Sequence, residues 1–201
     1  MTDPVGRAVE AIRAGSAVIL PTDTVYGLCA DGYREQPALR LFKLKKRPES
    51  LPIALLAAEL DVILDAVPEL RGRAAVAARA LLPGPYTLVL PNPARRFRWL
   101  CGSTPEKIGV RVPELCSEAQ AVLERVGAVA ATSANLHGRP EPARVADIPS
   151  ELSGKVDAVV DAGALPGRPS TVIDLTDREP RILREGAVPA AEALRLAIAA
   201  G

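Results

Sequence analysis

The sequence contains few of the side chains that serve enzymes as bases, nucleophiles or metal ligands. It has one histidine, His137, and three cysteines among 201 residues. The cysteines are odd in number and form no Cys-x-x-Cys pair, so we expect neither a disulfide framework nor a zinc site. A centre with several histidine ligands is excluded, and a Ser-His-Asp triad would have to use His137. We therefore expect no metal held by the protein itself.

Long apolar runs are also missing. No stretch of the chain approaches the ~20 apolar residues needed to cross a bilayer. Asp3, Arg7, Glu10 and Arg13 interrupt the N-terminal segment, which leaves no apolar core for a signal peptide. These absences predict a cytoplasmic protein with no membrane partner.

Neither sign of charge is in large excess. Lys and Arg total 25 and Asp and Glu total 24, so the formal net charge is +1 and strong overall attraction to nucleic acid is not indicated. Only five of the basic residues are lysines, and three of these stand at positions 43, 45 and 46. The scarce lysines are thus concentrated in one short segment.

Hydrophobic residues make up 48% of the chain and charged residues 24%, which is typical of a globular protein. Predicted helices and strands alternate along it, which favours an α/β (mixed α+β) fold with one large sheet in a single domain over residues 1–201. We expect helices at 4–14, 37–46, 59–66, 69–82 and 114–126 and from Pro189 onward. We expect strands at 16–20, 52–57, 86–90, 108–112, 128–131, 158–160, 171–175 and 181–184.

Four polar clusters follow or precede predicted strands. They are PTDTVYGL at 21–28, KLKKRP at 43–48, AATSAN at 130–135, and GRPSTVID at 167–174 with REG at 184–186. The first alone reads as an ordinary hydroxyl-capped turn, and the second as basic residues at a helix end or as a phosphate clamp. Together they predict a site for a polar ligand. Neither GxxxxGK[ST] nor GxGxxG occurs, which excludes the standard nucleotide-binding loops.

These segments, with PGPYT at 83–87 and GVRVP at 109–113, occur in the order typical of the threonylcarbamoyl-AMP synthase family. The resemblance covers the YrdC-like domain of that family, over roughly residues 8–188. It implies a YrdC-like fold, in which a twisted sheet of parallel and antiparallel strands is flanked by helices and has a basic concave face. Longer members carry an additional C-terminal domain, which we do not expect here.

The resemblance also implies an activity. Members of the family are nucleotidyltransferases that condense L-threonine, bicarbonate and ATP, with Mg²⁺, into threonylcarbamoyl-AMP and pyrophosphate. Downstream tRNA threonylcarbamoyl-transferase proteins then use the product to modify an adenosine of tRNA. A weak contact with RNA, of the double-stranded RNA-binding kind, is a further expectation.

The family's functional residues can be placed on this sequence motif by motif. The resemblance implies that Thr24, Arg111, Ala131 and Ser170 bind threonine. It implies that Lys45, Arg47, Ser133, Asn135 and Arg184 bind ATP. Lys45 and Arg47 are also the expected catalytic residues.

Several positions differ from the family pattern. Leu51 and Leu56 stand where many members have Asn and His, while His137 and Glu141 replace two Ser residues. The segments EKIGVRVP and STVIDLTD also resemble the YciO-type branch. Two alternatives therefore stay open: a relative that binds RNA or nucleotide without catalysis, and an enzyme of the same scaffold that acts on another carbamoyl or acyl acceptor.

Overall fold

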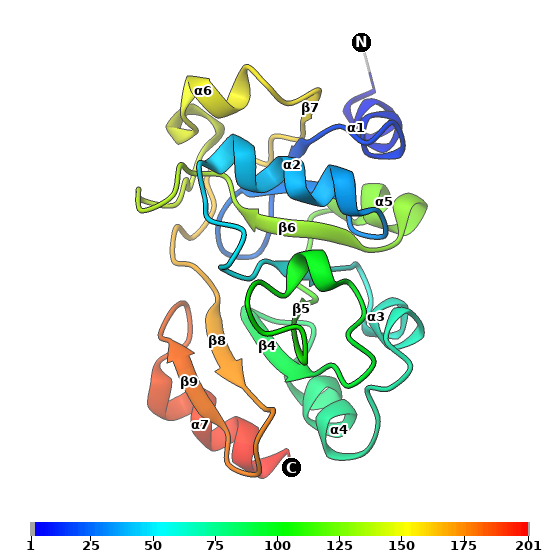
Figure 1. Ribbon diagram of the computed structural model, residues 1–201. Coiled ribbons are helices and arrows are strands. Elements are labelled where there is room, and N and C mark those ends of the chain that lie inside the picture. The colour runs from blue at the N-terminus through cyan, green and yellow to red at the C-terminus, as the bar shows by residue number, and fades with distance from the viewer. Residues whose placement is uncertain (1–2, 201) are drawn as a thin grey trace.

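A single nine-stranded sheet organises the computed structural model, which describes residues 3–200 (Figure 1). The strands are β1 (Val18–Leu20), β2 (Gly27–Asp31), β3 (Ala54–Leu56), β4 (Tyr86–Pro91), β5 (Lys107–Arg111), β6 (Val129–Ser133), β7 (Ala158–Val159), β8 (Thr171–Asp174) and β9 (Arg181–Arg184). Their order across the sheet is β7-β1-β2-β6-β3-β5-β4-β8-β9. The pairs β1–β7, β3–β5 and β4–β8 are parallel and the other neighbours are antiparallel, which confirms the predicted mixed sheet.

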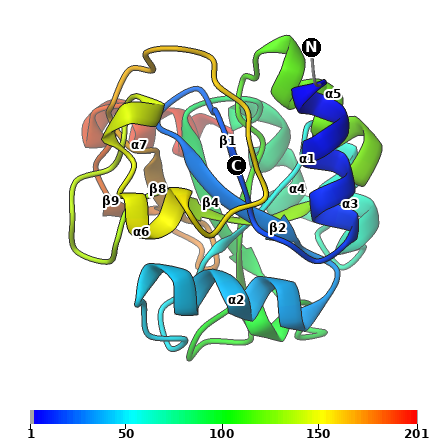
Figure 2. The same ribbon diagram turned by 90° about the horizontal axis from the view of Figure 1, so that it is seen from above.

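Helices cover both faces of this sheet, but unequally. They are α1 (Pro4–Arg13), α2 (Glu35–Lys45), α3 (Leu60–Ala66), α4 (Gly72–Leu81), α5 (Ser117–Val126), α6 (Ser150–Ser153) and α7 (Ala190–Ala199), with short 3₁₀ turns η1 (Arg98–Leu100) and η2 (Val145–Asp147). Buried residues of α2, α3, α4 and α7 share one hydrophobic cluster on one face. Only α1 and α5, which lie side by side in Figure 2, contribute to the second cluster on the other face.

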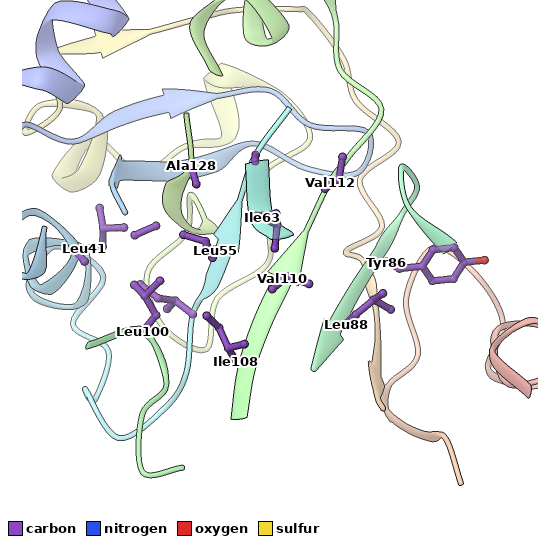
Figure 3. Close-up of a cluster of buried hydrophobic side chains, with 14 of the residues drawn as sticks. Leu41, Leu55, Ile63, Tyr86, Leu88, Leu100, Ile108, Val110, Val112 and Ala128 are labelled. Atoms are coloured by element: carbon purple, nitrogen blue, oxygen red, sulfur yellow. The ribbon is translucent and has the colours of Figure 1, made fainter. Parts of the chain in front are cut away.

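The larger cluster forms where alternate strand residues meet the first group of helices (Figure 3). Leu55 of β3, Leu88 of β4 and Val110 of β5 point into it together with Leu41 of α2 and Ile63 of α3, and all five are fully buried. Because side chains alternate across a strand, the neighbours of these residues lie on the opposite face of the sheet. At these strands the core lies on one face of the sheet, and the side chains of the other face are available to line a site.

Truncating the centre of this core should be costly. We expect Leu55→Ala to lower the free energy of unfolding by about 2–5 kcal/mol, because Leu55 is fully buried and its removal leaves a cavity. Val76→Ala on α4 is the matched control, since Val76 is 56% exposed and its change should stay within about 0.5 kcal/mol. Urea denaturation of both variants measures the difference, and equal midpoints would contradict this description of the core.

The smaller cluster covers only part of the opposite face. Ala8, Val9 and Ile12 of α1 and Val122 and Leu123 of α5 pack on it. They cover alternate residues of the strands at one side of the sheet, chiefly in β1, β2, β6 and β7. The cluster reaches Leu56 of β3, while the same face of β5, β4 and β8 contributes no residue to it within the described chain.

Most predicted elements are confirmed within a few residues, but one central strand was not predicted. β2 pairs with both β1 and β6, although its sequence GLCAD contains no β-branched or aromatic residue. β6 extends to Ser133, so the hydroxyls of the third polar cluster belong to the strand itself. The short α6 and the two 3₁₀ turns were also not predicted.

No helix within residues 3–200 has the length and apolar character that a membrane span requires.

Candidate functional site

A cavity of about 570 Å³ lies over the part of the sheet that α1 and α5 leave uncovered. Alternation along β5 shows how the sequence builds it: Lys107, Gly109 and Arg111 line the cavity, while Ile108 and Val110 are buried in the core. The cavity wall includes residues from all four polar clusters. Of the predicted site residues it contains Lys45, Arg47, Arg111, Ala131, Ser133, Asn135, Ser170 and Arg184.

Arg111 joins β5 to the first polar cluster. Its Nη2 donates to Asp23 Oδ1 (2.5 Å) and to the hydroxyls of Thr24 and Thr22, the latter at 3.3 Å. The Arg111 side chain is only 11% exposed, and burial lowers the pKa of its guanidinium while the Asp23 carboxylate opposes that shift. Its Nε is buried and meets no hydrogen-bond partner in the described chain. Arg111 thus lines the cavity with a guanidinium whose orientation is fixed by Asp23, Thr22 and Thr24.

The structure places Thr24 behind Arg111 rather than on the cavity wall. Thr24 is fully buried, and the neighbouring Thr22 lines the cavity instead. Thr22 Oγ1 donates to Val25 O (2.7 Å) and accepts from the backbone N–H groups of Thr24 and Val25 (both 3.3 Å). The cluster is therefore a hydroxyl-capped turn, and that turn also holds the side chain of Arg111 in place.

Lys45 lies at the end of α2 and connects it to the third polar cluster. Its Nζ donates to Ser133 O (2.5 Å), Asn135 O (2.7 Å) and Asn135 Oδ1 (2.9 Å). Ser133 Oγ donates to the same amide oxygen at 2.6 Å. Since an ammonium has three donors, these bonds use the capacity of Lys45 and position the loop after β6. Burial lowers the pKa of Lys45 to about 7, with the charge of Arg47 acting in the same direction and that of Glu141 opposing it.

This lowered pKa should be visible as a pH-dependent stability. Between its folded pKa of about 7 and its ordinary value of 10.5, Lys45 binds fewer protons in the native state than in the unfolded chain. Stability contributed by this group therefore rises with pH in that window and falls as pH drops toward 7. We expect the wild type to gain about 1–2 kcal/mol relative to Lys45→Met between pH 7 and pH 8.5. Chemical denaturation at both pH values measures this, and a pH-independent difference would contradict it.

Arg47 contributes a second guanidinium group to the cavity wall. Lys46, which ends α2, adopts a left-handed conformation (φ 53°), so the chain changes direction just before Arg47. Arg47 Nη2 donates to Pro52 O (3.0 Å), while its Nε is buried and finds no acceptor among residues 3–200. Burial lowers the pKa of Arg47, and the charge of Arg184 adds to this. Lys43 and Lys46 are exposed, and Lys46 pairs with Glu151 (2.9 Å). Of the four basic residues of this segment, only Lys45 and Arg47 line the cavity.

The fourth cluster closes the cavity from the C-terminal strands. Arg184 Nη2 donates to Ser170 O (2.8 Å) and to Ser170 Oγ (3.1 Å). Ser170 Oγ in turn lies 2.8 Å from Thr87 Oγ1 on β4. Burial and the charge of Arg111 lower the pKa of Arg184, while Glu141 opposes the shift. These contacts tie β9, β8 and β4 together at one side of the cavity.

Sequence reasoning missed several basic and hydroxyl side chains on the wall: Thr22, Thr87, Thr104, Lys107, Thr132 and Arg139. Lys107 Nζ donates to Asp174 Oδ2 (3.0 Å), a side chain that is only 5% exposed. Lys107 stands four residues before Arg111 on the same strand, so strand alternation alone would have placed it on the same face. His137 also lines the cavity, as does Glu141.

The acidic residues do not form a separate metal site. Within residues 3–200 no group of three or more His, Cys, Asp or Glu side chains is arranged to hold a metal ion. Glu141 is the one carboxylate that this described part of the chain contributes to the cavity wall. The described wall therefore carries six basic side chains and one acidic one, Glu141, and two of the six are paired with carboxylates: Lys107 with Asp174 and Arg111 with Asp23.

Comparison with known proteins agrees with this architecture. A threonylcarbamoyl-AMP synthase of Pyrococcus abyssi is 36% identical over 191 residues, which cover 92% of this chain and 54% of that protein. The crystal structure of P. abyssi Sua5 complexed with L-threonine superposes with a TM-score of 0.86 at 34% identity, over 96% of this chain and 56% of that one. The chain thus spans about half the length of these relatives.

A relative of similar length gives the same fold. The crystal structure of E. coli YciO superposes with a TM-score of 0.82 at 29% identity, covering 94% of this chain and 92% of that one. The model of the Sua5/YciO/YrdC family, described as "Telomere recombination", matches residues 10–186. The chain is therefore a member of the Sua5/YciO/YrdC family.

Proposed function

We propose that this chain is a nucleotidyltransferase that makes L-threonylcarbamoyl-adenylate from L-threonine, bicarbonate and ATP, releasing pyrophosphate. The observation that carries the proposal is a cavity lined by Arg47 and Arg111, each of which also has a buried guanidinium Nε that meets no partner in the described chain. Buried donors of this kind favour anionic ligands. The P. abyssi relative, whose structure contains L-threonine, supports an amino acid as one of them.

The two donors suit two different anions. Arg111 is held by Asp23 and by the hydroxyls of Thr22 and Thr24, so its orientation is set before a ligand arrives. We assign it to the carboxylate of threonine, with Ala131 and Ser170 as further residues of the cavity wall. Thr24 acts through Arg111, since it does not itself reach the cavity wall.

Arg47 and Arg184 are assigned to the phosphates of ATP. Ser133 and Asn135 border the same part of the wall, and Lys45 fixes their loop through its three hydrogen bonds. A direct bond between Lys45 and a phosphate would replace one of these three. Its first role in the structure is therefore to position the loop.

The reaction requires placement and fixed charge more than a base. The amine of threonine forms a bond to the carbon of bicarbonate with loss of water, which gives a carbamate. A carbamate oxygen then attacks the α-phosphorus, the α–β phosphoanhydride bond breaks, and pyrophosphate leaves with the developing charge. Positioned cations accelerate such a transfer by holding the reactants in line and stabilising that charge. This chemistry is compatible with a cavity that has only His137 as an imidazole.

Mg²⁺ fits this cavity as a companion of ATP. With Glu141 as the single carboxylate on the described wall, the phosphates themselves would supply most of its ligands, as is usual for nucleotide-bound Mg²⁺. The ion supplies charge neutralisation on the phosphates when bound.

One assay tests the proposal. The protein is incubated with ATP, Mg²⁺, bicarbonate and threonine, and pyrophosphate is followed with time. Release that depends on both bicarbonate and threonine supports the proposal, and release that continues without either would refute it. In the cell, the product would pass to tRNA threonylcarbamoyl-transferase proteins.

A second candidate function rests on the basic side chains of the cavity wall, Arg47, Arg139 and Arg184 among them. In this alternative the cationic cavity binds RNA or nucleotide without catalysis. Phosphate-driven binding weakens steeply with salt. Salt-sensitive binding of double-stranded RNA together with no pyrophosphate release would therefore favour this alternative.

A further inference from the structure

An irregular segment, residues 161–169, leads from β7 to β8, and we call it the strap. β7 is the first strand in the order of the sheet and β8 is the eighth, so the strap leads from one edge of the sheet to the strand beside the opposite edge (Figure 1). It contains no helix or strand, and most of its residues are exposed. Pro169, its last residue, and Ser170, which follows, line the cavity. The position of this part of the wall therefore depends on where the strap is held.

The hydroxyl of Tyr26 holds the beginning of the strap. Its O–H is directed to Asp161 Oδ1 (2.9 Å) and Gly163 O (2.8 Å), and its oxygen accepts from the Ala162 N–H (3.0 Å). Asp161 Oδ1 also accepts from the Gly163 N–H (2.8 Å). Tyr26 is fully buried, and burial raises the pKa of its phenol to about 12, so the hydroxyl keeps its proton at neutral pH. One buried side chain thus holds three consecutive residues of an exposed segment.

The turn that contains Tyr26 is connected to both sides of the site. Thr24 O accepts from the Gly167 N–H (2.9 Å) near the end of the strap, while the Thr24 hydroxyl accepts from Arg111 Nη2. Beyond the strap, Ser170 accepts from Arg184 through its O (2.8 Å) and its Oγ (3.1 Å). The turn therefore links the guanidinium assigned to the threonine carboxylate with the residues that follow the strap.

We propose that Tyr26 is a positioning residue, which fixes the strap and thereby sets the place of Ser170 relative to Arg111. The inference rests on the proposed function, in which Ser170 is assigned to threonine. Tyr26 does not line the described cavity, so it acts on a substrate through other residues. The strap is also held by the Leu165 N–H, which donates to Ala143 O (2.8 Å). Because an exposed segment with few buried contacts has a low local stability, loss of the phenol should let it shift.

Tyr26→Phe tests this inference, because it removes the hydroxyl and keeps the ring. We expect the KM for threonine, measured by pyrophosphate release, to rise about tenfold or more, since a small misplacement of a binding group is costly. Destabilisation alone would reduce the amount of folded enzyme, which lowers kcat and leaves KM unchanged. Tyr33→Phe is the matched control: the Tyr33 hydroxyl accepts from the Ala128 N–H (3.2 Å), and Tyr33 does not line the cavity. Its KM should equal that of the wild type.

A double-mutant cycle with Ser170→Ala shows whether the effect passes through Ser170. In that background Tyr26→Phe should change the KM for threonine much less than in the wild type, because the hydroxyl that the strap positions is gone. Equal rises in the two backgrounds, or an unchanged KM in Tyr26→Phe alone, overturn the inference and leave the proposed function intact. Absence of pyrophosphate release from the wild type overturns both.

If Tyr26→Phe fails to fold, as judged by circular dichroism, Asp161→Ala takes its place. Asp161 is exposed, so its substitution should leave the fold intact while it removes an acceptor from both the Tyr26 hydroxyl and the Gly163 N–H. We expect the KM for threonine to rise by about threefold to tenfold, which corresponds to the loss of one or two ordinary hydrogen bonds. A wild-type KM in this variant would then overturn the inference.

Discussion

Arg47→Ala is expected to reduce pyrophosphate release to background while the protein stays folded. Arg47 makes one hydrogen bond through Nη2, to Pro52 O, and its buried Nε has no partner in the described chain. The variant removes a fixed positive charge from the place assigned to the phosphates, where such a group contributes on the order of 10²–10³-fold in rate. Steady-state kinetics with ATP varied measures the loss, and circular dichroism with a thermal melt establishes that the fold remains.

The control for this experiment lies on α2, four residues before Arg47. Lys43 is exposed on α2 and does not line the cavity, so Lys43→Ala removes the same formal charge away from the site. We expect that variant to retain the wild-type rate. Arg47→Lys keeps the charge without the planar guanidinium and should recover only part of the rate. Full activity of Arg47→Ala would show that the phosphate assignment is wrong.

Arg111→Ala is expected to raise the KM for threonine by about 10–100-fold and the KM for ATP much less, because a charge-assisted bond to the carboxylate is lost. The same variant leaves Asp23, a side chain only 10% exposed, without its cation. Breaking a buried ion pair from one side typically costs about 3–5 kcal/mol, so stability should fall as well. Substrate-dependent kinetics and urea denaturation measure the two effects separately.

The double variant Asp23→Asn with Arg111→Met separates binding from stability. It removes both charges, so most of the lost stability should return. Affinity for threonine should stay low, because no guanidinium faces the cavity. Equal increases in the KM values of threonine and ATP in Arg111→Ala would contradict its assignment as the carboxylate partner.

The sequence predicted the secondary structure well where the pattern of neighbouring side chains determines it. The helix over residues 4–14 has its apolar side chains on one face and begins with Asp3 and Pro4, and the structure confirms it as α1. β2 was missed because its small side chains show little strand preference. It lies between β1 and β6, so its conformation is set by pairing on both sides and by packing against distant segments.

The candidate site was predicted only in part, because contacts with distant segments also decide which side chains reach it. The order of the motifs predicted Arg47, Arg111 and Arg184 as binding residues, and in the structure all three line one cavity. Which hydroxyl of the first cluster reaches that cavity was not predictable, because Thr22 and Thr24 belong to one turn. Their orientations depend on Arg111, which lies almost ninety residues further along the chain.

The parallel pairing of β4 with β8 has a consequence for folding. Tyr86 stands opposite Thr171, so this pair forms only after a long intervening segment has been closed into a loop. Non-local pairing of this kind slows folding relative to helical contacts between near neighbours in sequence. Ser170 and Arg184 join the cavity only once β8 is in place. The cavity is therefore complete only once β4 and β8 have paired, and a chain interrupted before residue 170 would carry Arg47 and Arg111 without Ser170 and Arg184.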